Sequence, residues 1–146
     1  MNRYVDTSVL AAYYCPELLS ELAERQLRAL DKPIVSWLTE VELYSALAKK
    51  VRRGTLRGED ARHIQELFRV HCTQGLYRVV RVDRDAYDRA RQWMAAQTTA
   101  LRTLDALHLA VAHRRGWCVL TADVTMAEAG IAFGVDVELL QVDVGS

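Results

Sequence analysis

Linker material, repeats and low-complexity segments are scarce in this chain of 146 residues. It has only two prolines and seven glycines, which leaves little material for a flexible connection between domains. The length suits one well-packed domain and is short for two. Because 51% of the residues are hydrophobic, the chain can bury a substantial core. The sequence therefore predicts a single domain that spans residues 1–146.

Membrane and disulfide signals are also missing. No uncharged apolar run approaches the ~18 residues of a membrane span, and no signal peptide opens the chain. Cys15, Cys72 and Cys118 are odd in number and form no CxxC or Cys/His zinc pattern. Buried, reduced thiols in a cytosolic protein explain them most simply. We therefore expect a cytoplasmic protein with no membrane contact.

The chain has no net charge, and three lysines stand against sixteen arginines. A neutral chain is not expected to coat nucleic acid nonspecifically, although it can still carry a local basic groove. The densest basic segment holds Lys49, Lys50, Arg52 and Arg53, at the end of an expected helix. Cations suit a helix C-terminus, which is one explanation of this segment. The other is contact with the phosphate backbone of RNA.

Short apolar strands alternate with helical segments along the chain. The expected strands cover residues 3–6, 34–36, 79–82, 117–121 and 137–142. The expected helices begin after residue 8 and then cover residues 17–31, 38–53, 58–74, 84–97, 103–115 and 124–133. Almost wholly apolar strands are typical of a parallel sheet that is covered on both faces. The pattern predicts a three-layer α/β/α domain with a mainly parallel sheet of roughly five strands.

Three of four candidate acids lie where such a sheet binds ligands, beyond the carboxyl ends of its strands, and the fourth, Asp105, can face the same cleft. Asp6 and Asp123 each follow a strand, Glu42 lies in the first turns of a helix, and Asp105 opens another helix. Each acid also has a structural explanation. Asp6 and Asp123 suit helix N-caps, the Thr39-x-x-Glu42 spacing fits a capping box, and Asp105 suits the helix dipole.

A divalent cation explains the acids better as a group. Four carboxylates in one cleft repel one another and raise their own pKa values, and a cation removes that conflict. Carboxylates suit hard ions such as Mg²⁺ or Mn²⁺. Such an ion can activate a water for attack, and a second ion can stabilise the leaving oxygen. The residues leave open whether one metal is bound or two.

The four acidic segments, MNRYVDTSVL, VSWLTEVELYSAL, LRTLDALHLAVA and VLTADVTMAEAG, resemble in order and spacing the motifs of PIN domains. They are most similar to the VapC-type toxins of bacterial and archaeal toxin–antitoxin pairs. The metal-binding acids of that family match Asp6, Glu42, Asp105 and Asp123. The polar positions that support these acids match Thr7, Ser8 and Thr121, with Ser8 where many relatives carry Asn.

The resemblance implies an endoribonuclease that depends on Mg²⁺ or Mn²⁺. It also implies a homodimer and a small VapB-like antitoxin that binds over the active site and represses the operon, so that operator DNA is contacted only through the antitoxin. Trp37 and Tyr44 are candidates for a dimer contact. The RNA target, the cleavage site and the antitoxin's identity are not encoded in these motifs.

Alternative functions remain at this point. A response-regulator receiver needs an acid pair after the first strand and a late lysine, but Asp6 is followed by Thr7 and Ser8, and no lysine follows Lys50. A haloacid-dehalogenase-type phosphatase needs Asp-x-Asp and fails at Ser8. A nuclease that acts on DNA, or in RNA processing outside a toxin–antitoxin pair, stays open, as does a non-catalytic binding module. No histidine shows a ligand spacing, and we interpret His108 as helix packing.

Overall fold

The structure is a computed structural model that describes residues 2–142. The ends of the predicted domain, residue 1 and residues 143–146, lie outside the described residues. The strands are β1 (Arg3–Val5), β2 (Ile34–Ser36), β3 (Arg78–Val80), β4 (Cys118–Thr121) and β5 (Val137–Leu139). The helices are α1 (Thr7–Tyr14), α2 (Ser20–Arg28), α3 (Trp37–Arg52), α4 (Gly58–Thr73), α5 (Arg84–Ala95), α6 (Thr103–Arg115) and α7 (Val124–Ala132). Every predicted element is present, in the predicted order.

The five strands form one parallel sheet in the order β3-β2-β1-β4-β5. Tyr4 in the central strand β1 pairs with Ile34 on one side and with Val119 on the other. The chain moves outward from β1 through β2 to β3, and then returns to the other side of β1 with β4 and β5. The strand order therefore reverses beside β1, and the crevice at such a point is where open α/β sheets bind ligands.

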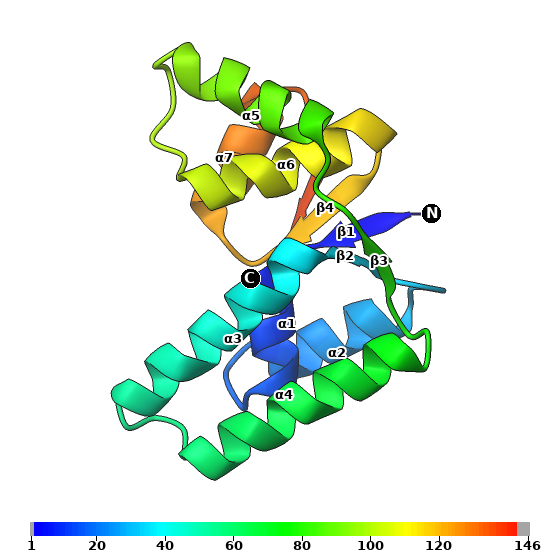
Figure 1. Ribbon diagram of the computed structural model, residues 1–146, viewed down its shortest axis with the longest axis vertical. Coiled ribbons are helices and arrows are strands. Elements are labelled where there is room, and N and C mark those ends of the chain that lie inside the picture. Colours follow the sequence, from blue (N-terminus) through cyan, green and yellow to red (C-terminus); the bar gives the residue numbers. More distant parts are fainter. Residues whose placement is uncertain (1, 143–146) are drawn as a thin grey trace.

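Helices cover both faces of the sheet (Figure 1). Because successive side chains of a strand point to opposite faces, neighbouring residues belong to different cores. Tyr4, Ile34 and Val119 pack in the core that contains α5, α6 and α7. Their neighbours Val5, Val35 and Leu120 pack in the core that contains α1 to α4. The predicted three-layer α/β/α architecture is confirmed.

Several element boundaries differ from the prediction by one to three residues, and the largest differences are in the second helix and the last strand. The helix expected over residues 17–31 is α2, which begins only at Ser20. The Ser20 hydroxyl accepts a hydrogen bond from the Glu17 backbone N–H and donates one to the Cys15 carbonyl, and so forms a turn before the helix. The last strand, expected to reach residue 142, ends at Leu139 beside the end of β4 at Thr121. None of the helices in the described part of the chain is long and apolar enough to cross a membrane.

Candidate active site

Asp6 lies directly after β1, at the point where the strand order reverses. It occupies the N-cap position of α1, but its side chain makes no capping hydrogen bond. Instead, its Oδ2 accepts hydrogen bonds from Ser8 Oγ at 2.6 Å and from Thr121 Oγ1 at 2.9 Å. The residue is only 5% exposed. Asp6 therefore stands at the predicted N-cap position without capping the helix through its side chain, and two hydroxyl groups hold its carboxylate.

Glu42 approaches Asp6 from α3. The capping-box explanation of Glu42 is wrong, because α3 begins at Trp37 and Thr39 occupies the third helical position. The Thr39 hydroxyl accepts a hydrogen bond from the Ser36 backbone N–H at 3.1 Å, so Thr39 and not Glu42 is the residue that caps this backbone N–H. Glu42 lies a further turn along the helix, where its Oε1 accepts a hydrogen bond from Thr7 Oγ1 at 3.0 Å and another from His108 Nε2.

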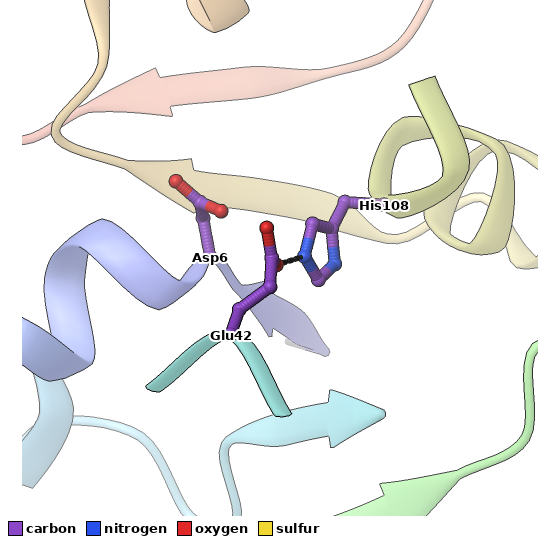
Figure 2. A group of neighbouring side chains, drawn as sticks. All are labelled: Asp6, Glu42 and His108. Atoms are coloured by element: carbon purple, nitrogen blue, oxygen red, sulfur yellow. Dashed lines mark hydrogen bonds and ion pairs between the residues drawn. The ribbon is translucent and has the colours of Figure 1, made fainter. Parts of the chain in front are cut away.

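His108 is a site residue that the sequence analysis missed. Its interpretation as helix packing is incomplete, because its ring meets the Glu42 carboxylate beside Asp6 (Figure 2). Potential ligand atoms of Asp6, Glu42 and His108 all lie within 4.8 Å of one another. The signal that would have found His108 is its position three residues after Asp105 in LRTLDALHLA, since side chains at that spacing share one face of a helix.

Asp123 and Asp105 lie outside that close group of three. Asp123 is the N-cap of α7, as one prediction held, and its Oδ1 accepts from the backbone N–H groups of Thr125 at 2.9 Å and Met126 at 3.3 Å. Asp105 lies in the first turn of α6, with its Oδ2 3.7 Å from Arg102 Nε. Its side chain is 15% exposed, whereas that of Arg102 is 84% exposed.

Asp105 nevertheless lies close enough to the other three acids for their negative charges to act on its pKa. Burial raises this pKa most, and the negative charge of Asp6 raises it further. Arg102 lowers it, but Asp123 and Glu42 act in the same direction as Asp6, so the net shift is upward. Burial also raises the pKa of Glu42, but hydrogen bonds from His108 and Thr7 outweigh burial and lower it overall. The structure thus favours an ionised Glu42 and penalises an ionised Asp105.

Three of the acids are held by one oxygen each. All the hydrogen bonds to these carboxylates from residues 2–142 reach Oδ2 of Asp6, Oε1 of Glu42 and Oδ1 of Asp123. Every fully buried side-chain nitrogen or oxygen in that range has a partner, so the second oxygens are not fully buried. Fixed carboxylates with one free oxygen each suit a hard divalent cation, whose ligands are commonly oriented by surrounding hydrogen bonds. The donor set therefore fits Mg²⁺ or Mn²⁺.

The hydroxyls of Ser8 and Thr121 connect Asp6 to the backbone of the segment that follows β4. Ser8 Oγ accepts a hydrogen bond from the Ala122 backbone N–H at 2.9 Å, and Thr121 Oγ1 accepts one from the Asp123 N–H at 3.0 Å. Each hydroxyl also donates to Asp6. The segment after β4 is therefore fixed to the carboxylate that follows β1.

The α3 basic patch, which we define as Lys49, Lys50, Arg52 and Arg53, lies at the other end of the helix that carries Glu42. At ~1.5 Å rise per residue, Lys49 lies roughly 10 Å along the helix axis from Glu42. Lys50 Nζ is 3.9 Å from a carboxylate oxygen of Glu17. Lys49, Arg52 and Arg53 are exposed. Arg102 is the basic side chain that acts on the pKa values of both Glu42 and Asp105.

Comparison with known proteins assigns the chain to a family. The sequence matches the PIN domain family over residues 3–132, and the chain belongs to this family. Within it, the chain is similar to Ribonuclease VapC3 of Pyrobaculum aerophilum. The two are 31% identical over 129 residues, which cover 88% of this chain and 94% of the relative. The resemblance carried by the four acidic segments is confirmed.

Solved structures agree on the fold. VapC20 of Mycobacterium tuberculosis, a toxin that cleaves the sarcin–ricin loop, is 21% identical with a TM-score of 0.69, and the match covers 88% of this chain and 95% of that one. VapBC2 of Rickettsia felis, bound to a DNA fragment from its promoter, is 11% identical with a TM-score of 0.69, over 97% of this chain and 100% of that one. At these identities the likeness shows a shared fold.

Proposed function

We propose that this protein is an endoribonuclease that depends on Mg²⁺ or Mn²⁺ and acts as the toxin of a toxin–antitoxin pair. The observation that carries the proposal is the set of carboxylates at the reversal of strand order, of which Asp6, Glu42 and Asp123 are each held by one oxygen with the other free. A non-catalytic binding module has no need to gather these acids, because burial and the neighbouring negative charges raise the pKa of Asp105, which costs stability.

Asp6, Glu42, Asp105 and Asp123 are the proposed ligands, directly or through water. A bound ion would lower the pKa of an attacking water molecule and would offset the negative charge that develops on the phosphate. The protein's own contribution is positioning. Thr7, Ser8 and Thr121 hold Asp6 and Glu42 through their hydroxyls, so the ligands do not have to be ordered when the ion and the phosphodiester arrive.

RNA is the proposed substrate because the relative with 31% identity is a ribonuclease. The exposed side chain of Arg102, beside the acids, suits contact with a phosphate near the reacting bond. The α3 basic patch is proposed as a second, more distant contact with the RNA backbone. DNA as the substrate is the alternative that a cleavage assay decides.

The proposed partners follow from the family and from one solved neighbour. VapBC2 is bound to a fragment of its promoter, which supports a small VapB-like antitoxin that covers the active site and carries the contact with operator DNA. A homodimer is also proposed. Trp37 is 55% exposed and Val41 is 67% exposed one turn further along α3, so an apolar contact between two copies would bury both. The proposed compartment is the cytoplasm.

The test is cleavage of a labelled RNA with and without Mn²⁺, by the wild-type protein and by Asp6→Asn. Asparagine keeps the size of the side chain and can still accept from Ser8 and Thr121, but it removes the charge that an ion needs. We expect the variant to fold, to lose cleavage by orders of magnitude, and to bind Mn²⁺ more weakly by calorimetry. Cleavage at the wild-type rate in the presence of a chelator would overturn the proposal. Cleavage of single-stranded DNA and not of RNA would replace the substrate.

A further inference from the structure

A chain of buried polar side chains runs from the sheet to Glu42. Tyr4 in β1 lies between Ser36 and His108: its hydroxyl is 2.8 Å from Ser36 Oγ and 2.5 Å from His108 Nδ1. The other ring nitrogen of His108 bonds to Glu42 Oε1. Tyr4 and His108 are 0% exposed, and Ser36 is 1% exposed. Polar groups this deeply buried cost stability unless they are all paired, so their presence in the core calls for a reason.

The chemistry of the acceptor fixes the direction of the hydrogen bonds. An ionised carboxylate only accepts, so the hydrogen between His108 and Glu42 lies on Nε2 of the ring. In a neutral ring, Nδ1 is then an acceptor, and it accepts from the Tyr4 hydroxyl. The Tyr4 oxygen in turn accepts from Ser36 Oγ. Each ring nitrogen of His108 thereby has one partner, which leaves the imidazole a single orientation.

We propose that His108, oriented by Tyr4 and Ser36, is a positioning residue that holds Oε1 of Glu42 and so turns Oε2 toward the metal site. The proposal rests on the proposed function, since Glu42 is a ligand there, and it extends that function to residues outside the four acids. His108 donates to the same oxygen as Thr7, so two donors act on Oε1 and none on Oε2 within the described part of the chain.

Two other roles for His108 make different demands. A direct metal ligand needs a free nitrogen lone pair facing the site, but Nε2 carries the hydrogen given to Glu42 and Nδ1 faces the Tyr4 hydroxyl. A packing residue needs only a side chain of suitable shape in the core, and the two hydrogen bonds would then be incidental. The experiments below separate these roles.

The first experiment needs no metal. In the chelator-treated protein, ¹⁵N NMR of the histidine rings reports which nitrogen of His108 carries hydrogen. We expect a protonated Nε2, and we expect Tyr4→Phe to shift the His108 ring signals because the partner of Nδ1 is lost. Tyr77→Phe is the matched control: it removes a buried hydroxyl that is hydrogen-bonded to Tyr14 away from the acids, and it should leave those signals unchanged. An unprotonated Nε2 would overturn the proposal.

The second experiment compares two conservative substitutions of His108 by calorimetric titration with Mn²⁺. In His108→Gln, the side-chain amide reaches the position of Nε2 and can still donate to Glu42. In His108→Asn, the shorter amide reaches only the position of Nδ1, so the contact with Tyr4 survives and the donor to Glu42 is lost. Loss of a group that orients a ligand typically weakens metal binding about 10- to 100-fold. We expect that loss for Asn, and an affinity within about threefold of wild type for Gln, as a rescue of the donor.

Equal affinities for the two variants, whether both normal or both weak, would overturn the proposal and leave His108 a packing residue. A nitrogen coupling in the electron spin echo spectrum of wild-type protein with Mn²⁺, absent in His108→Gln, would overturn it in favour of direct ligation. Failure of the proposed function looks different: wild-type protein would then bind no Mn²⁺, and Asp6→Asn would change nothing, whatever the NMR of the ring shows.

Discussion

Thr121→Val tests how much of the site's order depends on one buried hydroxyl. Valine has nearly the shape of threonine, so the substitution leaves no large cavity, but it removes the oxygen. Thr121 Oγ1 donates to Asp6 Oδ2 at 2.9 Å and accepts from the Asp123 backbone N–H at 3.0 Å, and the residue is 0% exposed. One atom thus connects β1 to the segment that carries Asp123.

The expected cost follows from these two bonds. A hydrogen bond to a charged group contributes ~1.5–3 kcal/mol, and one between neutral groups ~0.5–1.5 kcal/mol. Asp6 keeps its bond from Ser8, which holds the estimate in the lower half of the combined range. We therefore expect a loss of about 3 kcal/mol in the free energy of unfolding. For a domain of this size, that loss lowers Tm by roughly 6–12 °C.

Thermal and urea unfolding of the metal-free protein measure this loss, with Thr73→Val as the control. Thr73 is exposed, and its hydroxyl donates only to the Arg69 carbonyl within its own helix, so the control should stay within about 0.5 kcal/mol of wild type. Titration with Mn²⁺ should also show weaker binding for Thr121→Val alone. A Tm for Thr121→Val that matches the Tm of Thr73→Val would refute the assignment of Thr121 as a support for Asp6.

Three further predictions follow from the structure. The pKa of Asp105 is raised above its ordinary 3.8, so its contribution to stability is present at low pH and is lost as pH rises through the raised pKa. Asp105→Asn should therefore raise the Tm of the chelator-treated protein at pH 7, and this gain should shrink on acidification. A lower Tm for the variant at pH 7 would contradict this. Neutralising the α3 basic patch should weaken RNA binding and flatten its dependence on salt in filter-binding assays, whereas unchanged affinity and slope would leave the patch a solvated helix end. Gly130→Ala should lower Tm, since an added Cβ overlaps Cγ2 of Val137 in β5; a variant as stable as wild type would show that β5 can shift.

The fold was predictable because each element leaves a local signal. Apolar strands and periodic helices alternate along the chain, and these patterns do not depend on distant contacts. The boundaries were less predictable, because they depend on local chemistry that competes with periodicity. The leucines at positions 18 and 19 suit a helix, yet the Ser20 hydroxyl bonds to Glu17 and Cys15 and so forms a turn that excludes them.

The acids of the site were predictable from their positions after strands and from the family resemblance, but the roles of individual side chains were not. The spacing from Thr39 to Glu42 fits a capping box, and so does the spacing from Ser36 to Thr39. The choice between them depends on where β2 ends, and pairing with β3 extends β2 to Ser36. The role of His108 depends on contacts 66 residues away with Glu42 and 104 residues away with Tyr4. The spacing from Asp105 to His108 within α6 places His108 on the face of the site, but it does not identify these two partners.

The pKa values of Glu42 and Asp105 shift in opposite directions, and the hydrogen bonds that each carboxylate receives explain the difference. Glu42 receives donors from Thr7 and His108, and its pKa is lowered despite burial. Asp105 receives no side-chain or backbone donor from residues 2–142 beyond the 3.7 Å approach of Arg102, and its pKa is raised. Glu42 therefore stays ionised with one oxygen free, whereas burial and the negative charges of its neighbours penalise the ionised form of Asp105. A cation beside Asp105 would offset the neighbouring negative charges, so binding of the ion and ionisation of Asp105 would each favour the other.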